Sequence, residues 1–129
     1  MPLVKISLLK GRSKPEKKQL LDLVHLSLVE AFKIPDHDRL QRIYEFNEDE
    51  FEIPNDRSKK FTIIEITIFP GRSVEAKKKL YKLIFNKLKK LGYSDNDAVV
   101  VLHEPELNNW GLRSGLSGSE IEFGFNLEV

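Results

Sequence analysis

The residue best suited to chemistry is a proline that directly follows the first methionine. Removal of Met1, which is usual before a small residue, leaves Pro2 as a secondary amine that can act as a general base or acid. An α-amino group titrates near pH 8, and burial lowers that pKa toward neutrality. The plain alternative is that Met-Pro is an ordinary chain start.

A repeated arginine is the second candidate for chemistry. Arg12 and Arg72 each occur in a Gly-Arg-Ser tripeptide, one residue before a serine that can cap a helix. A guanidinium beside the free N–H groups of a helix start forms a pocket for a carboxylate or a phosphate. The simpler alternative for each copy is a solvated arginine in a turn.

Two further side chains could complete a site. Asp38, which precedes a predicted strand, could hold a water molecule or polarise a substrate oxygen, but it could equally cap a turn or pair with Arg39. Trp110, the only tryptophan, could form the wall of a pocket or anchor the C-terminal tail.

The composition restricts the kinds of chemistry that are available. The chain has 129 residues, 40% of them apolar, a net charge of +1, no cysteine and three scattered histidines without ligand spacing. We therefore expect no thiol chemistry, metal or cofactor, and neither nucleic acid nor a membrane as partner. The N-terminus lacks the apolar region of a signal peptide, which predicts a cytoplasmic protein.

An internal repeat organises the chain. At an offset of 60, nine of 28 positions are identical between residues 3–30 and 63–90, and Gly11-Arg12-Ser13 returns as Gly71-Arg72-Ser73. At an offset of 59, Asp36-His37-Asp38 then matches Asp95-Asn96-Asp97. We interpret this as a duplication.

Each copy predicts a strand, a helix and a second strand. Alternating β-branched residues indicate the first strands, Ser13 and Ser73 cap the helices, and residues 40–46 and 98–103 form the second strands. The predicted fold is α+β: a single domain over residues 1–129, with units at about 1–46 and 61–104 and a tail at 105–129. Two β-α-β units would share a mixed four-stranded sheet with both helices on one face.

Other features of the sequence predict further details of this fold. Residues 98–102 are apolar on both faces, which predicts a central strand, and residues 120–129 alternate enough to suggest a final strand. His25 interrupts an apolar stripe and is expected to be a hydrogen-bonded core residue. The lysines of the second helix are expected on its solvated face, and the uncovered face of the sheet predicts an oligomer.

Together these residues resemble the tautomerase superfamily, whose members carry a catalytic amino-terminal proline on a β-α-β building block. The opening Pro2 to Ser13 looks like the start of 4-oxalocrotonate tautomerase. The fused two-unit length, Ala31 to Arg39 and the Trp110-Gly111 pair are similar to malonate semialdehyde decarboxylase. One departure is Pro70, which stands where the decarboxylase has the first of two arginines.

The resemblance implies roles for four residues and a homotrimer. Pro2 would transfer the proton, Asp38 would work with it to activate water, Arg72 would bind the substrate carboxylate and Trp110 would line the pocket. The expected activity is cofactor-independent tautomerisation of a small 2-oxo or unsaturated acid. The alternatives are a decarboxylase or hydratase, in which Pro2 stays cationic, and a non-catalytic oligomeric interaction protein.

Overall fold

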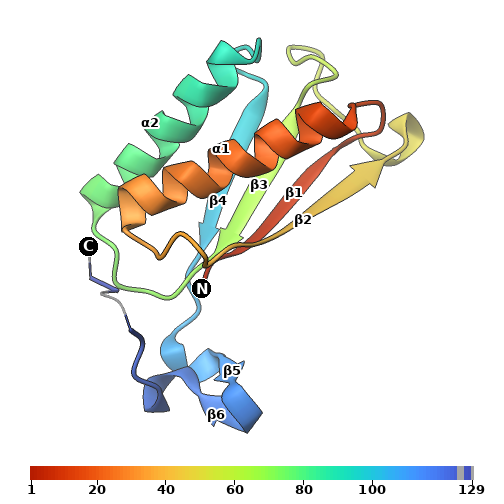
Figure 1. The fold of residues 1–129 in the computed structure, drawn as a ribbon. Helices are drawn as coiled ribbons and strands as arrows, with labels where there is room; N and C mark the ends of the chain where they lie inside the picture. The colour runs from red at the N-terminus through yellow and green to blue at the C-terminus, as the bar shows by residue number, and fades with distance from the viewer. Residues whose placement is uncertain (125–126, 129) are drawn as a thin grey trace.

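The computed structural model describes residues 1–124, 127 and 128, and its main elements follow the repeat (Figure 1). The first unit consists of β1 (Leu3–Leu9), α1 (Lys14–Phe32) and β2 (Leu40–Phe46). The second consists of β3 (Thr62–Thr67), α2 (Val74–Lys90) and β4 (Ala98–His103). None of the helices in the described residues is long and apolar enough to cross a membrane.

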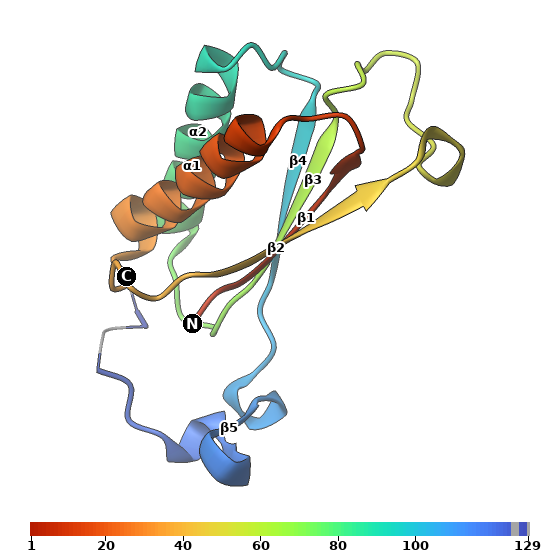
Figure 2. The same cartoon turned by 45° about the vertical axis from the view of Figure 1, so that its right-hand side comes forward.

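The four strands form one mixed sheet in the order β2-β1-β3-β4. The strands of each unit run parallel, and the two units meet through the antiparallel pair of β1 and β3, in which Leu3 lies opposite Thr67. Both helices cover the same face of this sheet (Figure 2). The predicted fold class, with its duplicated β-α-β units, is therefore confirmed.

Both helices begin where the serine caps were predicted. The Ser13 hydroxyl accepts a hydrogen bond from the Glu16 amide at 3.2 Å, and the Glu16 carboxylate accepts one from the Ser13 amide at 3.4 Å, which completes a capping box. The Ser73 hydroxyl accepts from the Ala76 amide at 3.1 Å. These caps satisfy N–H groups that the helices leave free, and they end each strand-to-helix turn at a defined residue.

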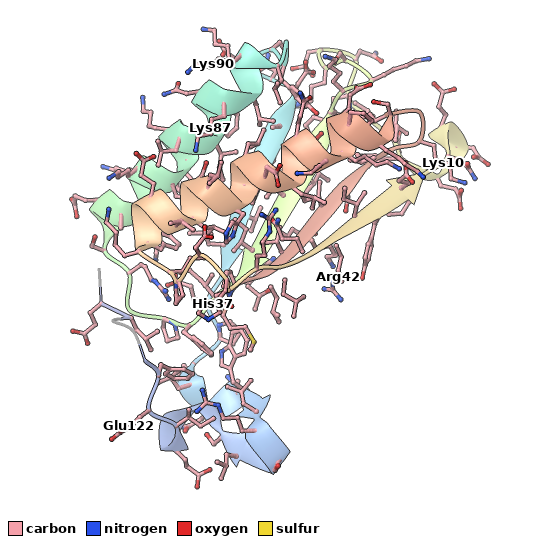
Figure 3. All side chains as sticks on the ribbon, viewed as in Figure 1. Lys10, His37, Arg42, Lys87, Lys90 and Glu122 are labelled. Carbon is pink, nitrogen blue, oxygen red and sulfur yellow. The ribbon has the colours of Figure 1, made fainter. Side chains whose placement is uncertain are left out.

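The core lies between the helices and the covered face of the sheet. Alternate residues of β1 and β3 point into it and meet the apolar stripes of the helices; its fully buried members include Ile6, Leu8, Leu28, Phe32, Ile64, Ile66, Leu80 and Ile84. His25 is buried among them, and its Nε2 lies 2.8 Å from the Asp36 carbonyl oxygen, so the prediction for His25 is confirmed. Lys90 on α2 is exposed, whereas Lys87 is half-buried and donates to the Ser27 hydroxyl of α1 at 3.3 Å (Figure 3).

The prediction that residues 98–102 form a central strand is wrong. β4 is an edge strand, with Ala98 buried under the helices and Val99 and Val101 on the opposite face, each 37% exposed. Leu40 and Tyr44 of β2 are also exposed, so both edge strands present apolar side chains to solvent. Apolar residues on both faces of β4 therefore reflect an uncovered sheet face rather than a central position.

The C-terminal tail is mostly irregular. It forms short 3-10 turns and a two-stranded ribbon in which β5 (Gly111–Leu112) pairs with β6 (Leu116–Ser117). The predicted strand over residues 120–129 is wrong for residues 120–124, where the structure has a 3-10 turn and irregular chain. Residues 125, 126 and 129 lie outside the described residues, so the prediction there has no outcome.

Hydrogen bonds to Asp97 anchor the loop between the two units to the second unit. Its carboxylate accepts hydrogen bonds from the Ser58 amide at 2.9 Å, the Ser58 hydroxyl at 2.8 Å and the Ser94 amide at 3.0 Å. Burial alone would raise the pKa of Asp97, but these hydrogen bonds outweigh it and hold the pKa at about 2. The ionised carboxylate therefore stabilises the folded chain.

Replacing Asp97 with Asn should lower the free energy of unfolding at pH 7 by about 1–2 kcal/mol, allowing for solvent screening. Because the pKa of Asp97 falls on folding, its contribution is complete above about pH 4 and is lost as the pH falls toward 2. Urea unfolding at fixed protein concentration and at pH 7 and 3 measures this difference. The exposed Asp95→Asn variant is the control, and an Asp97→Asn loss that is the same at both pH values contradicts the prediction.

Candidate active site

The chain terminus lies at the end of the sheet where β1 begins and β3 ends. Pro2 is buried at the start of β1, and the Met1 amine lies 3.1 Å from Oδ2 of Asp38. The Asp38 amide donates to the Pro35 carbonyl in the turn before β2, and the Asp38 side chain is 19% exposed. Arg39 pairs with Asp22 at 2.9 Å, which leaves the Asp38 carboxylate to the terminal amine.

Arg72 lies beneath this terminus on the turn from β3 to α2. The left-handed backbone at Gly71, with φ of +125°, turns the chain so that Arg72 is only 7% exposed. Its Nη1 donates to the Phe69 carbonyl at 3.0 Å, and its guanidinium carbon lies 5.2 Å from the centre of the Phe32 ring. The buried Nε of Arg72 has no hydrogen-bond partner in the described structure.

The charges of this cluster act on one another. Burial lowers the pKa of the Met1 amine; the charge of Asp38 and its hydrogen bond raise it, and the Arg72 charge lowers it. The net effect is a terminal amine with a pKa below 8.0. Burial likewise lowers the pKa of Arg72, opposed by Glu104 and Asp38, and a guanidinium remains a cation at neutral pH.

A cavity of about 200 Å³ opens beside the terminal amine. It is lined by Met1, Asp38, Phe69, Leu112, Arg113 and Phe123. The last three belong to the C-terminal tail. In Figures 1 and 2 this tail lies below the end of the sheet at which the N-terminus of the chain is found. The tail also passes close to Gly71, where a Cβ would lie 3.0 Å from the Leu127 carbonyl oxygen. The tail of the same chain therefore helps to enclose the cavity.

Trp110 supports this cavity from behind. It is 8% exposed, its Nε1 donates to the Pro105 carbonyl at 3.1 Å, and its carbonyl accepts from the Gly118 amide at 2.9 Å. Its ring lies 4.5 Å from that of Phe69, which in turn lies 4.5 Å from that of Phe123. Trp110 thus anchors the tail and backs the aromatic wall, and it reaches the cavity through Phe69.

The structure brings Asp38 and Arg72 to the chain terminus, where the Met1 amine next to Pro2 is paired with Asp38, and Trp110 lies behind Phe69. Sequence reasoning missed four side chains that line the cavity: Phe69, Leu112, Arg113 and Phe123. Phe69 precedes the repeated Gly-Arg-Ser and could have been noticed for that reason. The tail residues follow no periodicity, and no sequence signal marks them. Figure 3 shows His37 at this end of the sheet and Lys10 at the other.

The duplication places a second constellation at the opposite end, where Arg12 helps to line a cavity of about 300 Å³. Thr62 stands at the position equivalent to Pro2, Arg12 at that of Arg72 and Asp97 at that of Asp38. Nη1 of Arg12 donates to the Thr62 hydroxyl at 2.9 Å, and its Nη2 donates to the Lys60 carbonyl. Because Thr62 is within the chain it has no amine, and the Arg12 guanidinium is held by these contacts.

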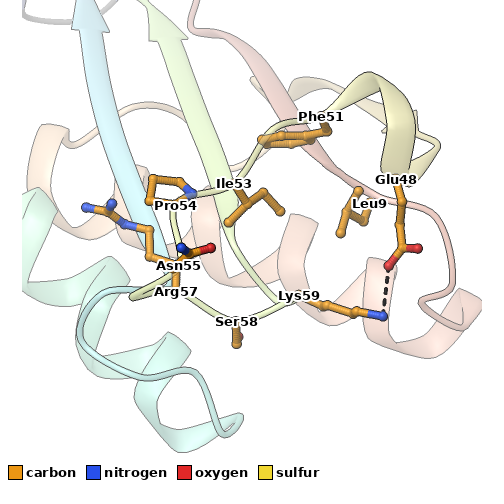
Figure 4. Close-up of a pocket in the computed structure, with 9 residues that line it drawn as sticks. All are labelled: Leu9, Glu48, Phe51, Ile53, Pro54, Asn55, Arg57, Ser58 and Lys59. Atoms are coloured by element: carbon orange, nitrogen blue, oxygen red, sulfur yellow. Dashed lines mark ion pairs between the residues drawn. The ribbon is translucent and has the colours of Figure 1, made fainter.

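A larger cavity, of about 390 Å³, lies in the loop between the two units (Figure 4). Its charged side chains are already paired: Lys59 with Glu48 at 2.8 Å, and Arg57 with the Asn96 carbonyl at 3.1 Å. It therefore offers no free amine beside a carboxylate. No cluster of three or more potential metal ligands exists among the described residues.

What these groups can do follows from their chemistry. An amine whose pKa is lowered can accept a proton near neutral pH, and an adjacent cation can stabilise an enolate oxygen or a carboxylate. The cluster is therefore suited to proton transfer on a small acid.

Known proteins are similar to this chain in sequence. A family profile described as "Tautomerase enzyme" matches residues 38–113, and a second profile with the same description matches residues 2–60. Two Bacillus subtilis (strain 168) proteins, Probable tautomerase YrdN and Probable tautomerase YusQ, are each 31% identical over 121 residues. These matches cover 89% of this chain and 93% and 95% of the two relatives.

Solved structures of other proteins share this fold. A malonate semialdehyde decarboxylase, described with decarboxylase and hydratase activities, is 30% identical with a TM-score of 0.76 over 86% of this chain and 90% of its own. A fused 4-OT described as an asymmetric trimer shares the fold, with a TM-score of 0.81 at 18% identity over 92% and 97% of the two chains. Profiles that span most of the sequence and relatives matched over nearly their full length show that this chain belongs to the tautomerase family.

Proposed function

We propose that this protein is a cofactor-independent tautomerase that interconverts the keto and enol forms of a small 2-oxo or unsaturated carboxylic acid. One observation carries the proposal: the Met1 amine, next to Pro2 in the chain, lies 3.1 Å from Asp38 at the wall of a small cavity, and the charge of Arg72 lowers its pKa. Amine, carboxylate and guanidinium are the groups that proton transfer on an acid requires.

Removal of Met1 is part of this proposal. With Met1 present, the Pro2 nitrogen is an amide without basicity, and the Met1 residue takes up part of the cavity lining. Its removal would make the buried Pro2 the terminal amine, one residue along the chain from the position of the Met1 amine. It also opens space toward the buried Arg72, which would then bind the substrate carboxylate and stabilise the negative charge of the enolate.

In the proposed reaction Pro2 acts first as a base and then as an acid. The neutral amine takes a proton from the hydroxyl group or the α-carbon and returns it to another atom of the same substrate. Asp38 holds the amine by its hydrogen bond and stabilises the ammonium that forms. Trp110 keeps Phe69 in place as the wall of the pocket.

Replacing Pro2 with Ala should lower kcat/KM for ketonisation of phenylenolpyruvate, followed by ultraviolet absorbance, by about 10²- to 10⁴-fold. Intact-mass measurement first establishes that Met1 is absent from the wild-type and variant proteins. A preparation that retains Met1 should be as inactive as the variant, because its Pro2 nitrogen is an amide. An unchanged kcat/KM in Pro2→Ala would show that Pro2 is not the base.

A decarboxylase or hydratase is the second candidate. It is favoured by the ion pair between the terminal amine and Asp38, which would keep the amine protonated, and by the similarity to the malonate semialdehyde decarboxylase structure. In that mechanism Pro2 acts as a cationic acid, and Asp38 positions water.

The pH dependence of Asp38→Asn separates the two candidates. Because Asp38 raises the amine pKa, its replacement should lower that pKa further. For a neutral base, the rising limb of kcat/KM against pH then shifts to lower pH. For a cationic acid, it is the falling limb that shifts to lower pH, and activity at neutral pH drops. An unshifted profile, with wild-type activity on every acid tested, would remove Asp38 from the mechanism.

We also propose that the protein is a homotrimer. The uncovered sheet face and the half-exposed Val99 and Val101 on the edge strand β4 support an association of subunits, and fused 4-OT structures with this fold are described as trimers. Native mass spectrometry should show a mass three times that of the chain. Replacing Val101 with Glu should shift the protein to monomers, whereas Lys78→Glu on the solvated face of α2 should not. A monomeric wild-type protein would refute the assembly.

A further inference from the structure

Two ion pairs occupy equivalent positions in the two units. In the second unit Lys77, in the first turn of α2, lies 2.6 Å from Oε1 of Glu104, which directly follows β4. In the first unit Lys17 pairs with Glu45 at 3.3 Å, and the repeat offsets of 60 and 59 relate these residues to Lys77 and Glu104. Each pair joins the start of a helix to the end of the second strand of its unit. The contact is therefore present in both copies, although only the second copy carries Arg72.

In the second unit this ion pair lies near the buried Arg72. Nη1 of Arg72 donates to the carbonyl of Phe69, which follows Ile68 in the chain. The Ile68 amide in turn donates to the carbonyl of His103, which precedes Glu104, at 2.8 Å. These contacts bring the turn that carries Arg72 alongside Glu104. Among the charges that act on Arg72, that of Glu104 has the largest effect on its pKa, which it raises against the effect of burial.

Glu104 nevertheless makes no ion pair with Arg72. The described residues place no carboxylate within ion-pair distance of the Arg72 guanidinium, and its buried Nε has no hydrogen-bond partner there. A buried cation without a carboxylate is unfavourable, so a neighbouring carboxylate that was free to move would pair with it. Glu104 is not free, because Lys77 holds it, and the two side chains are only 25% and 26% exposed.

We propose that Lys77 is a positioning residue: by holding Glu104, it keeps the guanidinium of Arg72 available to the substrate carboxylate. Glu104 stays near enough to offset part of the charge of the buried guanidinium, yet it does not occupy the N–H groups that an acid would bind. Without Lys77, Glu104 would compete with the substrate for Arg72 from within the protein. This inference rests on the proposed function, which gives Arg72 its role.

NMR of the ¹⁵N-labelled, Met1-free protein without a ligand tests the pairing itself. In Lys77→Met the released Glu104 carboxylate should accept hydrogen bonds from Arg72, so the Arg72 side-chain N–H resonances should shift and their exchange with water should slow by about 10-fold. Lys17→Met makes the same change at the equivalent position of the first unit, so it is the matched control and should leave these resonances in place. Lys77→Arg keeps the cation and should resemble wild type. Unshifted Arg72 resonances in Lys77→Met, or an equal shift in Lys17→Met, would overturn the proposal.

Steady-state kinetics test the consequence for the substrate. Lys77→Met should raise KM for phenylenolpyruvate by about 10-fold and change kcat by less than about 2-fold, because the bound acid has already displaced Glu104. Adding Glu104→Gln to Lys77→Met removes the competing carboxylate and should return KM to within about 3-fold of wild type. An ion pair with only a structural role predicts no such recovery, and a double variant with the KM of Lys77→Met would overturn the proposal. The NMR measurement requires no turnover, so its outcome is independent of whether Pro2→Ala abolishes tautomerisation.

Discussion

The antiparallel pairing of β1 with β3 determines where the candidate active site lies. Since Leu3 lies opposite Thr67, the start of the first unit meets the turn that follows the third strand. The terminal amine and Arg72 are some 70 residues apart in sequence, yet this pairing makes their charges interact. A parallel pairing would have placed the same two groups at opposite ends of the sheet.

The duplicated sequence yields only one candidate site with an amine. Pseudo-symmetry places Arg12 against Thr62 as it places Arg72 near Pro2, and the Arg12 guanidinium is held by hydrogen bonds within the protein. A cavity of about 300 Å³ lies beside Arg12, and the loop that leads into Thr62 is held there by the hydrogen bond from the Ser58 amide to Asp97. A chain terminus occurs only once, so the duplicated unit retained its fold while only the first copy can offer an amine.

Local signals made much of this fold predictable from the sequence. Serine caps and strand alternation depend only on residues that are near one another along the chain. The repeat then placed Arg72 in the turn before a helix and Asp38 just before a strand. The position of β4 was missed because apolar residues on both faces do not distinguish a central strand from an edge strand with an uncovered face. Arg113 and Phe123 were missed because their place at the cavity depends on the irregular path of the tail.

The balance of charge around the amine is what separates the two candidate reactions. Burial and Arg72 favour the neutral amine that a base requires, whereas Asp38 favours the ammonium that an acid requires. A substrate carboxylate bound to Arg72 would offset that cation and raise the amine pKa again. An anionic substrate would therefore itself influence the protonation of the base. In the proposed reaction the charge of the substrate and the pKa of the amine would thus be coupled, and a change at Arg72 should alter both.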